Sequence, residues 1–460
     1  MKWNDLCLHK IKWILACIVV LLPFFCSISN AFQKYLAVTL WAIMMWMFEL
    51  LPEEIVAIML PGLYVLFDIT DYATAFSAWT TSTPWITLGG LMIGGMIVKS
   101  GLVSRIAYKS LLLTQGSLNG IVWGITLTCT IFTPLIPSIM AKVALLVPVV
   151  IGICKVLKIE EKSRTASALM LVVFFALWSP KMAFMTASTD SILTAGILEQ
   201  YLGAKITWLA WAKDMFIPGI LWMLVSIPLI YILKPQHLNL NKEYLEMEYR
   251  KLGRMSIEEK KTIVLITSLL VLLIFSSWHK LPEGVLMLGM GCLGFFPGIG
   301  LLKSEDFGKI QFKVVFFLAG AVTIGAVASD IGITKSVINF VQPYFEQMNS
   351  YELVMSIYIF SVLANFLLNP LAFIATLMIP IANLCSNLGY SATVGGYSMI
   401  MGFNQALFPY EIAPLMLVYG FGCLKLTHLI KVMALRIVVG IIFMTIITYP
   451  YWLYIGLLDK

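Results

Sequence analysis

Long apolar segments separated by short polar connections are the main feature of this chain of 460 residues. Runs such as WILACIVVLLPFFCSI, TIVLITSLLVLLIFSSW and VVGIIFMTIITYPYWLYIGLL reach the roughly 20 apolar residues that a helix needs to cross a membrane. About ten such segments occur along the chain. Because backbone groups in lipid must be hydrogen-bonded within the protein, the pattern predicts an all-α polytopic membrane protein.

Composition agrees with this class, since 60% of the residues are hydrophobic and 12% are charged. The formal net charge of +7 is spread over the ends of the apolar segments, so we expect no nucleic-acid partner. The eight cysteines include no CxxC pair, and the four histidines have no ligand spacing, so neither a disulfide framework nor a metal centre is expected. The first apolar run is interpreted as a spanning helix, with a cleaved signal peptide as the alternative.

Basic residues predict the orientation of the chain. They precede the first apolar run, cluster in KVLKIEEKSR at 155–164, and fill the long polar segment at 234–261. Because cytoplasmic loops carry an excess of Lys and Arg, these regions are expected on the cytoplasmic side, as are two further loops around 303–313 and 425–436. The nearly uncharged tail WLYIGLLDK is expected outside, which gives a plasma-membrane protein with a cytoplasmic N-terminus and an external C-terminus.

The polar segment 234–261 is interpreted as a linker between two halves, 1–233 and 262–460. GGLMIGGMIVKSG from Gly89 matches GAVTIGAVASDIG from Gly320, and two further matches follow in the same order at nearly the same offset. The first repeat is followed by a basic loop and the second by an uncharged one, which favours an inverted repeat, the architecture in which secondary transporters build a midplane site. The alternative is that small residues only allow close helix packing.

Prolines and polar residues interrupt the apolar segments at two places in each half. The phrase TPLIPSIMAK predicts a re-entrant hairpin near 119–153, and a second hairpin is predicted near 351–385. The segments 178–196 and 402–422 predict two helices that are broken near the membrane midplane.

Polar side chains at these four interruptions are candidates for anion binding, because amides, hydroxyls and amines can hold carboxylate oxygens. The predicted substrate-binding residues are Ser138, Lys142, Lys181, Thr186, Ser188, Thr189, Asn369, Asn404 and Gln405. Ionisable groups inside a membrane are functional candidates by default, although a lysine can also reach the interface and Glu411 can close a helix junction. Asp190 would repel an anion unless Lys181 or Lys142 paired with it, and the sequence leaves that choice open.

Six segments, in order, resemble the divalent anion:sodium symporter family, which includes citrate/succinate exchangers and plastid dicarboxylate translocators. The resemblance covers nearly the whole chain and implies an elevator-type transporter with about eleven transmembrane helices, two re-entrant hairpins and a homodimeric assembly in the lipid bilayer. The segments are WMFELLPEEIVAIMLP, WITLGGLMIGGMIVKSGLVSRIAY, TPLIPSIMAK, GAKITWLAWAKDMFIPGI, LGRMSIEEK and GFNQALFPYEIAPLMLVYGFG.

The resemblance also implies a Ser-Asn-Thr signature at each hairpin tip, which binds sodium ions and substrate carboxylates in this family. Ser138 keeps the serine of the first signature, but Ile139 and Met140 replace the other two residues. The second signature is replaced by Pro-Leu-Ala at 370–372, next to Asn369. Because sodium needs several hard oxygen ligands, sodium coupling is in doubt, although an ion near Ser138 and Asn369 remains an alternative.

We therefore expect a secondary transporter of small di- or tricarboxylates that works by anion exchange, with Lys142 or Lys181 in place of a coupling ion. Lys142 stands where exchanger-type members of the family carry a basic residue. Sodium-coupled symport, another anion such as sulfate, and a non-transporting membrane sensor are the alternatives. Enzyme activity is not expected, because no nucleophile elbow, metal-ligand helix motif or phosphate loop is found.

Overall fold

The computed structural model describes residues 3–25, 29–48, 50–114, 117–202, 206–236, 242–333, 342–366 and 370–459, and these residues are helical with no strand. The main helices before the polar segment are α1 (Trp3–Leu21), α2 (Asn30–Met47), α3 (Glu53–Leu66), α5 (Ser82–Lys99), α6 (Leu102–Leu113), α7 (Leu118–Phe132), α8 (Ile139–Val156), α9 (Arg164–Trp178), α10 (Thr189–Leu202) and α11 (Trp208–Ser226).

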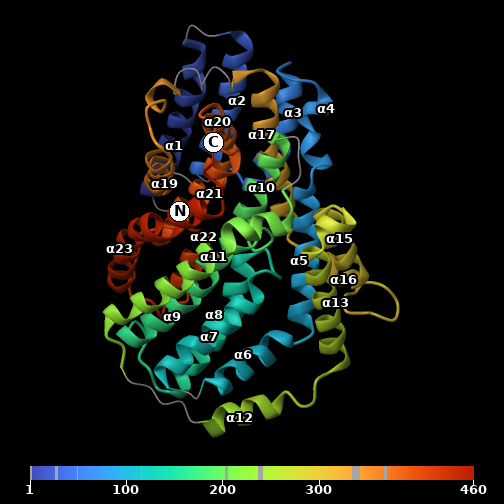
Figure 1. Cartoon of the computed structure of the whole chain (residues 1–460), viewed down its shortest axis with the longest axis vertical. Helices are drawn as coiled ribbons and strands as arrows, with labels where there is room; N and C mark the ends of the chain where they lie inside the picture. The colour runs from blue at the N-terminus through green and yellow to red at the C-terminus, as the bar shows by residue number, and fades with distance from the viewer. Residues whose placement is uncertain are drawn as a thin grey trace.

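Shorter helices and a second series of long ones complete the fold (Figure 1). The remaining main helices are α12 (Lys242–Lys251), α13 (Ile257–Ile274), α15 (Glu283–Leu293), α17 (Phe312–Asp330), α19 (Ser350–Asn365), α20 (Pro370–Asn387), α21 (Ala392–Phe403), α22 (Ala413–Gly420), α23 (Leu426–Phe443) and α24 (Tyr449–Tyr454). The short ones are α4 (Tyr72–Ala75), α14 (Ser276–His279) and α16 (Ser304–Phe307).

Six helical stretches among the described residues are long and apolar enough to cross a membrane, which confirms the polytopic all-α class. A further bent pair, α5 with α6, passes the same test with a kink of 66°. The full count of about eleven spans stays a prediction. The stretches are Ile139–Val156, Arg164–Ala183, Trp208–Leu233, Phe312–Asp330, Pro370–Asn387 and Leu426–Tyr454.

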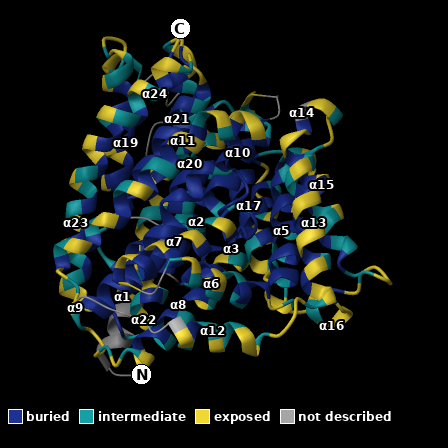
Figure 2. Ribbon diagram, turned by 60° about the horizontal axis from the view of Figure 1, so that its bottom comes forward, coloured by how far each residue is buried: buried dark blue, intermediate teal, exposed yellow. Residues whose placement is uncertain are grey.

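The described residues of the polar segment 234–261 include helical structure. It contains α12, which packs against α6, and it includes the first turn of α13. That turn begins with a capping box in which Ser256 and Glu259 satisfy each other's backbone N–H groups. Figure 1 places α12 at the end of the molecule away from the C-terminus, and Figure 2 shows α12 and α24 on opposite sides.

Helix α9 is enclosed by other helices, and all of its residues from Thr165 to Trp178 are buried. It packs against both arms of the first hairpin, α7 and α8, and also against α11, α22 and α23. The second half of the broken helix, α10, packs against α5, α17, α20 and α21. Figure 2 shows this core as buried, whereas α13, α19 and α23 carry exposed residues on their outer sides.

Elements that the predicted repeat pairs with one another make similar contacts. The hairpin arm α8 packs against α9, and its counterpart α20 packs against α21. The contacts then cross between the halves, because α10 packs against α20 and α22 packs against α8. The two candidate hairpins and the two broken helices therefore form one packed unit.

The two glycine phrases have matching structural roles. A Cβ atom at Gly89 would lie 2.2 Å from the backbone of Met287 in α15, and one at Gly320 would lie 2.4 Å from the backbone of Ala57 in α3. Both positions therefore need glycine because another helix backbone comes too close for a side chain.

The last glycine of each phrase ends a helix. Gly101 follows α5 with a φ of 81°, and Gly332 follows α17 with a φ of 76°. Other L-residues rarely adopt this left-handed conformation, which glycine adopts without strain. Close packing thus explains Gly89 and Gly320, and helix termination explains Gly101 and Gly332.

Candidate functional site

The first broken helix places a buried ion pair at its junction. Helix α9 ends at Trp178, a 3-10 turn spans Pro180–Ala183, and α10 begins at Thr189. Lys181 is fully buried in the turn, and its Nζ donates a hydrogen bond to Asp190 Oδ2. The same Nζ lies 3.2 Å from the centroid of the Trp178 ring. The partner of Asp190, which the sequence left open, is therefore Lys181.

The hydroxyl groups of the first junction are engaged with neighbouring elements. Thr186 Oγ1 donates to the carbonyl oxygen of Pro134 at 3.0 Å and so ties the junction to the turn of the first hairpin. Ser188 Oγ shares a hydrogen bond of 3.0 Å with Ser191 Oγ. Thr189 is half-buried as the first residue of α10.

A buried lysine connects the first hairpin to this junction. Ser138 caps α8 by accepting a hydrogen bond of 3.2 Å from the N–H of Ala141. One turn later, Lys142 Nζ donates to the carbonyl oxygens of Thr133 at 3.3 Å and Ala187 at 3.0 Å. Its side chain is 1% exposed and, among the described residues, forms no ion pair with a carboxylate. Lys142 therefore brings a buried amine to the contact between hairpin and broken helix.

The second broken helix meets the first through reciprocal hydrogen bonds. Helix α21 ends at Phe403, and Asn404 Nδ2 donates to the carbonyl oxygen of Trp178 at 2.9 Å. Trp178 Nε1 donates in return to the carbonyl oxygen of Asn404 at 2.9 Å. The C-terminal end of α9 is therefore hydrogen-bonded by Asn404, and the C-terminal end of α21 is hydrogen-bonded by Trp178.

Glu411 lies in the junction that follows Asn404. Its carboxylate accepts hydrogen bonds from the N–H groups of Leu407 at 3.1 Å and Phe408 at 2.7 Å. Asn365 of the second hairpin donates to Glu411 Oε2 at 3.4 Å and to the carbonyl oxygen of Gln405 at 2.7 Å. These contacts give Glu411 the role of closing the junction, which was the structural alternative for this residue.

Arg436 is a further polar residue of the site that the sequence reasoning missed. The positive-inside pattern assigned it to a cytoplasmic loop, and this assignment is wrong, because Arg436 is fully buried within α23. Its guanidinium donates to the carbonyl oxygen of Asn404 at 2.6 Å and to Ser179 Oγ at 3.1 Å. A single arginine inside an otherwise apolar run was the available signal.

The structure brings most of the predicted residues together and leaves one outside its description. Direct contacts connect the hairpin turn with the first junction and the first junction with the second. Gln405 joins them through the hydrogen bond that its Oε1 accepts from Arg436 at 3.2 Å. Asn369 lies outside the described residues, and so does the tip of the second hairpin at 367–369.

Basic side chains outnumber acidic ones in this centre. Three buried cations, Lys142, Lys181 and Arg436, face two buried acids, Asp190 and Glu411. Asp190 pairs with Lys181, whereas the contacts described for Glu411 are with backbone and amide N–H groups. Within the part of the chain that the structure describes, Lys142 and Arg436 form no ion pair, so a bound anion would supply the acidic partner that they lack.

The first hairpin tip does not fit a sodium ion. Ser138 Oγ caps a helix, and the side chains of Ile139 and Met140 have no oxygen. The carbonyl oxygens of Thr133 and Ala187 accept hydrogen bonds from the Lys142 ammonium, which would also repel a second cation. The donor set there suits a fixed amine better than a metal ion.

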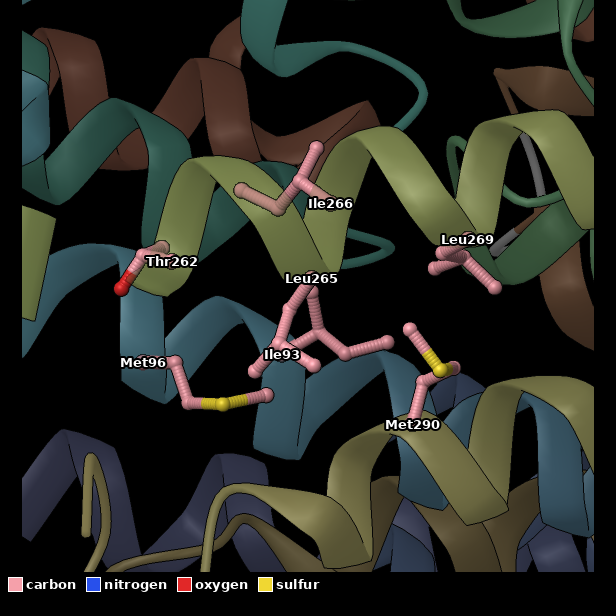
Figure 3. Close-up of a pocket in the computed structure, with 7 residues that line it drawn as sticks. All are labelled: Ile93, Met96, Thr262, Leu265, Ile266, Leu269 and Met290. Carbon is pink, nitrogen blue, oxygen red and sulfur yellow. The ribbon is translucent and has the colours of Figure 1, made fainter. Parts of the chain in front are cut away.

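A separate small cavity between α5, α13 and α15 does not have the chemistry of an anion site (Figure 3). Its lining is apolar apart from Thr262, whose hydroxyl donates to the carbonyl oxygen of Glu258 at 2.8 Å. We therefore place the candidate site at the two helix junctions.

Comparison with known proteins gives the family. The model of the sodium:sulfate symporter transmembrane region matches residues 5–458. The chain is 27% identical over 53% of its length to the chloroplast dicarboxylate transporter 1 of Spinacia oleracea and spans 43% of that relative. It is 25% identical to the inner membrane protein YbhI of Escherichia coli, with 66% of this chain and 67% of the relative aligned.

A third relative aligns over almost the whole length of both chains. The L-tartrate/succinate antiporter of Escherichia coli is 23% identical to this chain, with 96% of each covered. The family model, which matches nearly all residues, confirms the resemblance seen in the sequence. The chain therefore belongs to the divalent anion:sodium symporter family.

Proposed function

We propose that this protein is a secondary transporter of small di- or tricarboxylate anions and that it works by exchanging one anion for another. The observation that carries the proposal is the buried ammonium of Lys142, which lies between hairpin and broken helix without an acidic partner among the described residues. Named relatives include dicarboxylate transporters and a tartrate/succinate antiporter, which supports an anionic organic substrate.

The geometry suggests how an anion is bound. Helix α8 begins beside Lys142, and helix N-termini attract anions through their free N–H groups and dipole. A carboxylate that approaches Lys142 can take over hydrogen bonds that its ammonium now donates to Thr133 and Ala187. The Lys181–Asp190 pair is already neutral, so its role is to support the junction rather than to bind the anion.

Exchange rather than sodium symport is favoured by the same contacts. A fixed ammonium occupies the carbonyl oxygens that would otherwise be available to a coupling cation. A transporter with built-in cations carries excess positive charge when it is empty, which disfavours return of the empty site across the membrane. Each anion that leaves would then have to be replaced by another.

The inverted repeat, the elevator movement and the homodimer belong to this proposal as well. The crossed contacts of α10 with α20 and of α22 with α8 support a transport domain in which the hairpins and broken helices of both halves move as one unit. The separation of α12 from α24 supports a cytoplasmic linker and an external C-terminus in the plasma membrane (Figure 2).

The test is uptake of radiolabelled succinate, citrate and 2-oxoglutarate into proteoliposomes. The vesicles are preloaded with unlabelled anion or with buffer, each with and without a sodium gradient. The expected result is uptake that requires internal anion and does not depend on the sodium gradient. Uptake that is driven by sodium into anion-free vesicles would support symport instead, and no uptake of any of the three anions would refute carboxylate transport.

A further inference from the structure

The C-terminal ends of two broken helices converge on one arginine. Helix α9 has Ser179 as its C-cap residue, and α21 has Asn404. Arg436 Nη2 donates to Ser179 Oγ at 3.1 Å and to Asn404 Oδ1 at 2.5 Å, while Nη1 donates to the Asn404 carbonyl oxygen at 2.6 Å and to Gln405 Oε1 at 3.2 Å. The guanidinium therefore connects both junctions at once.

This arrangement has the chemistry of a cation site. A helix C-terminus carries roughly half a negative charge, so two of them offset about one positive charge. In transporters with broken helices, unwound carbonyls and helix C-terminal ends coordinate coupling cations. Here the oxygens of Ser179, Asn404 and Gln405 surround a cation that is covalently attached to α23.

We propose that Arg436 is a built-in cation that takes the place of a bound ion at the two helix C-termini and holds the broken helices in their binding position. This inference rests on the proposed anion exchange and adds a positioning residue to it. The network continues to the anion site, because Asn404 bonds to Trp178, and the Trp178 ring lies under the ammonium of Lys181.

The fit to a guanidinium, rather than to any positive charge, is specific. The planar group lies between two aromatic rings, with its carbon 5.2 Å from the centroid of Phe175 and 4.8 Å from that of Trp222. Trp222 Nε1 also donates to Asn404 Oδ1 at 2.9 Å, which orients the amide toward Arg436. A lysine ammonium lacks the flat fork needed to reach both junctions while stacking on the rings.

Close packing brings α23 to this position. A Cβ atom at Gly440 would lie 2.6 Å from Gln405 Nε2 and 2.7 Å from the hydroxyl of Tyr358. The absent side chain therefore allows the turn of helix that follows Arg436 to lie directly on the second junction.

The inference predicts chemical rescue of Arg436→Ala. In this variant the oxygens of both junctions lose their cation. A flat space also remains beside the rings of Phe175 and Trp222. We expect succinate exchange to fall about tenfold or more, and millimolar guanidinium chloride to restore it while sodium and methylammonium chloride do not. Guanidinium should also raise the melting temperature of Arg436→Ala in detergent but not that of the wild type.

Two further variants keep the test decisive. Arg436→Lys retains the charge and, because an ammonium cannot span both junctions, should raise the apparent KM for succinate. Arg105→Lys is the matched control, since Arg105 is a buried arginine that binds Glu259 and linker carbonyls far from the site. It should lower stability without changing KM.

The outcomes separate this inference from the proposed function. If the wild-type protein exchanges anions, but guanidinium restores neither the transport nor the melting temperature of Arg436→Ala, the role of Arg436 is refuted and the proposed function stands. If Arg436→Ala does not fold, an unchanged KM in Arg436→Lys would overturn that role equally. Absence of exchange in the wild type would refute the proposed function, while the melting experiment still tests the cation site.

Discussion

Replacing Asp190 with Leu should destabilise the protein strongly, because it leaves the buried amine of Lys181 without its counter-charge. The side chains of Lys181 and Asp190 are 0% and 7% exposed, so water cannot replace the lost partner. Removing one member of a buried ion pair costs about 3–5 kcal/mol. The Trp178 ring, which lies 3.2 Å from the Lys181 ammonium, remains in the variant and favours the lower end of this range, about 3 kcal/mol.

The measurement is the free energy of unfolding in a denaturant titration of purified protein, with Lys181→Met, Asp190→Leu and the double variant as a cycle. Each single variant should lose about 3 kcal/mol or more, whereas the double variant should lie within about 1 kcal/mol of the wild type, since a well-packed apolar pair replaces a buried ion pair at little cost. The reasoning would be refuted if the single variants had the wild-type free energy of unfolding. It would also be refuted if the stability losses of the two single variants added up in the double variant.

Two further changes test the packing and the charges around the site. Gly219→Ala should destabilise by about 1–3 kcal/mol, because the new Cβ would lie 2.7 Å from Ala183 Cβ and would push the 3-10 turn that carries Lys181; an unchanged melting temperature would contradict the close approach of α11. Outside the membrane, a hydrogen bond from Lys99 lowers the pKa of Asp306 from 3.8 to about 2. This pair should therefore stabilise the fold above about pH 4 and be lost as the pH falls toward about 2, and Asp306→Asn should remove that part of the pH dependence of the melting temperature.

The fold class and the helix breaks were predictable from local physical rules. Apolar runs of membrane-spanning length specify helices, and a proline beside polar residues ends one, as Pro180 does after α9. The glycine phrases were recognisable for the same reason, since small residues mark close helix contacts. None of these rules depends on which distant segments meet.

The pairing inside the site was not predictable, because it depends on long-range contacts. The sequence placed Lys142, Lys181 and Asp190 near one another but could not choose the ion pair. Arg436 was assigned to a loop because the positive-inside rule treats cations near a helix end as cytoplasmic markers. Its partners, Ser179 and Asn404, lie 257 and 32 residues away in the chain, so only the packed fold shows that the arginine is internal.

Binding of succinate to purified protein, measured by calorimetry in sodium-free buffer, tests the central claim most directly. The account predicts that the wild type binds succinate without sodium and that Lys142→Met weakens binding about tenfold or more, because the buried ammonium is the partner of the carboxylate. Lys142→Arg should retain part of the affinity. Binding that strictly requires sodium, or that is unchanged in Lys142→Met, would contradict the claim that fixed cations hold the anion.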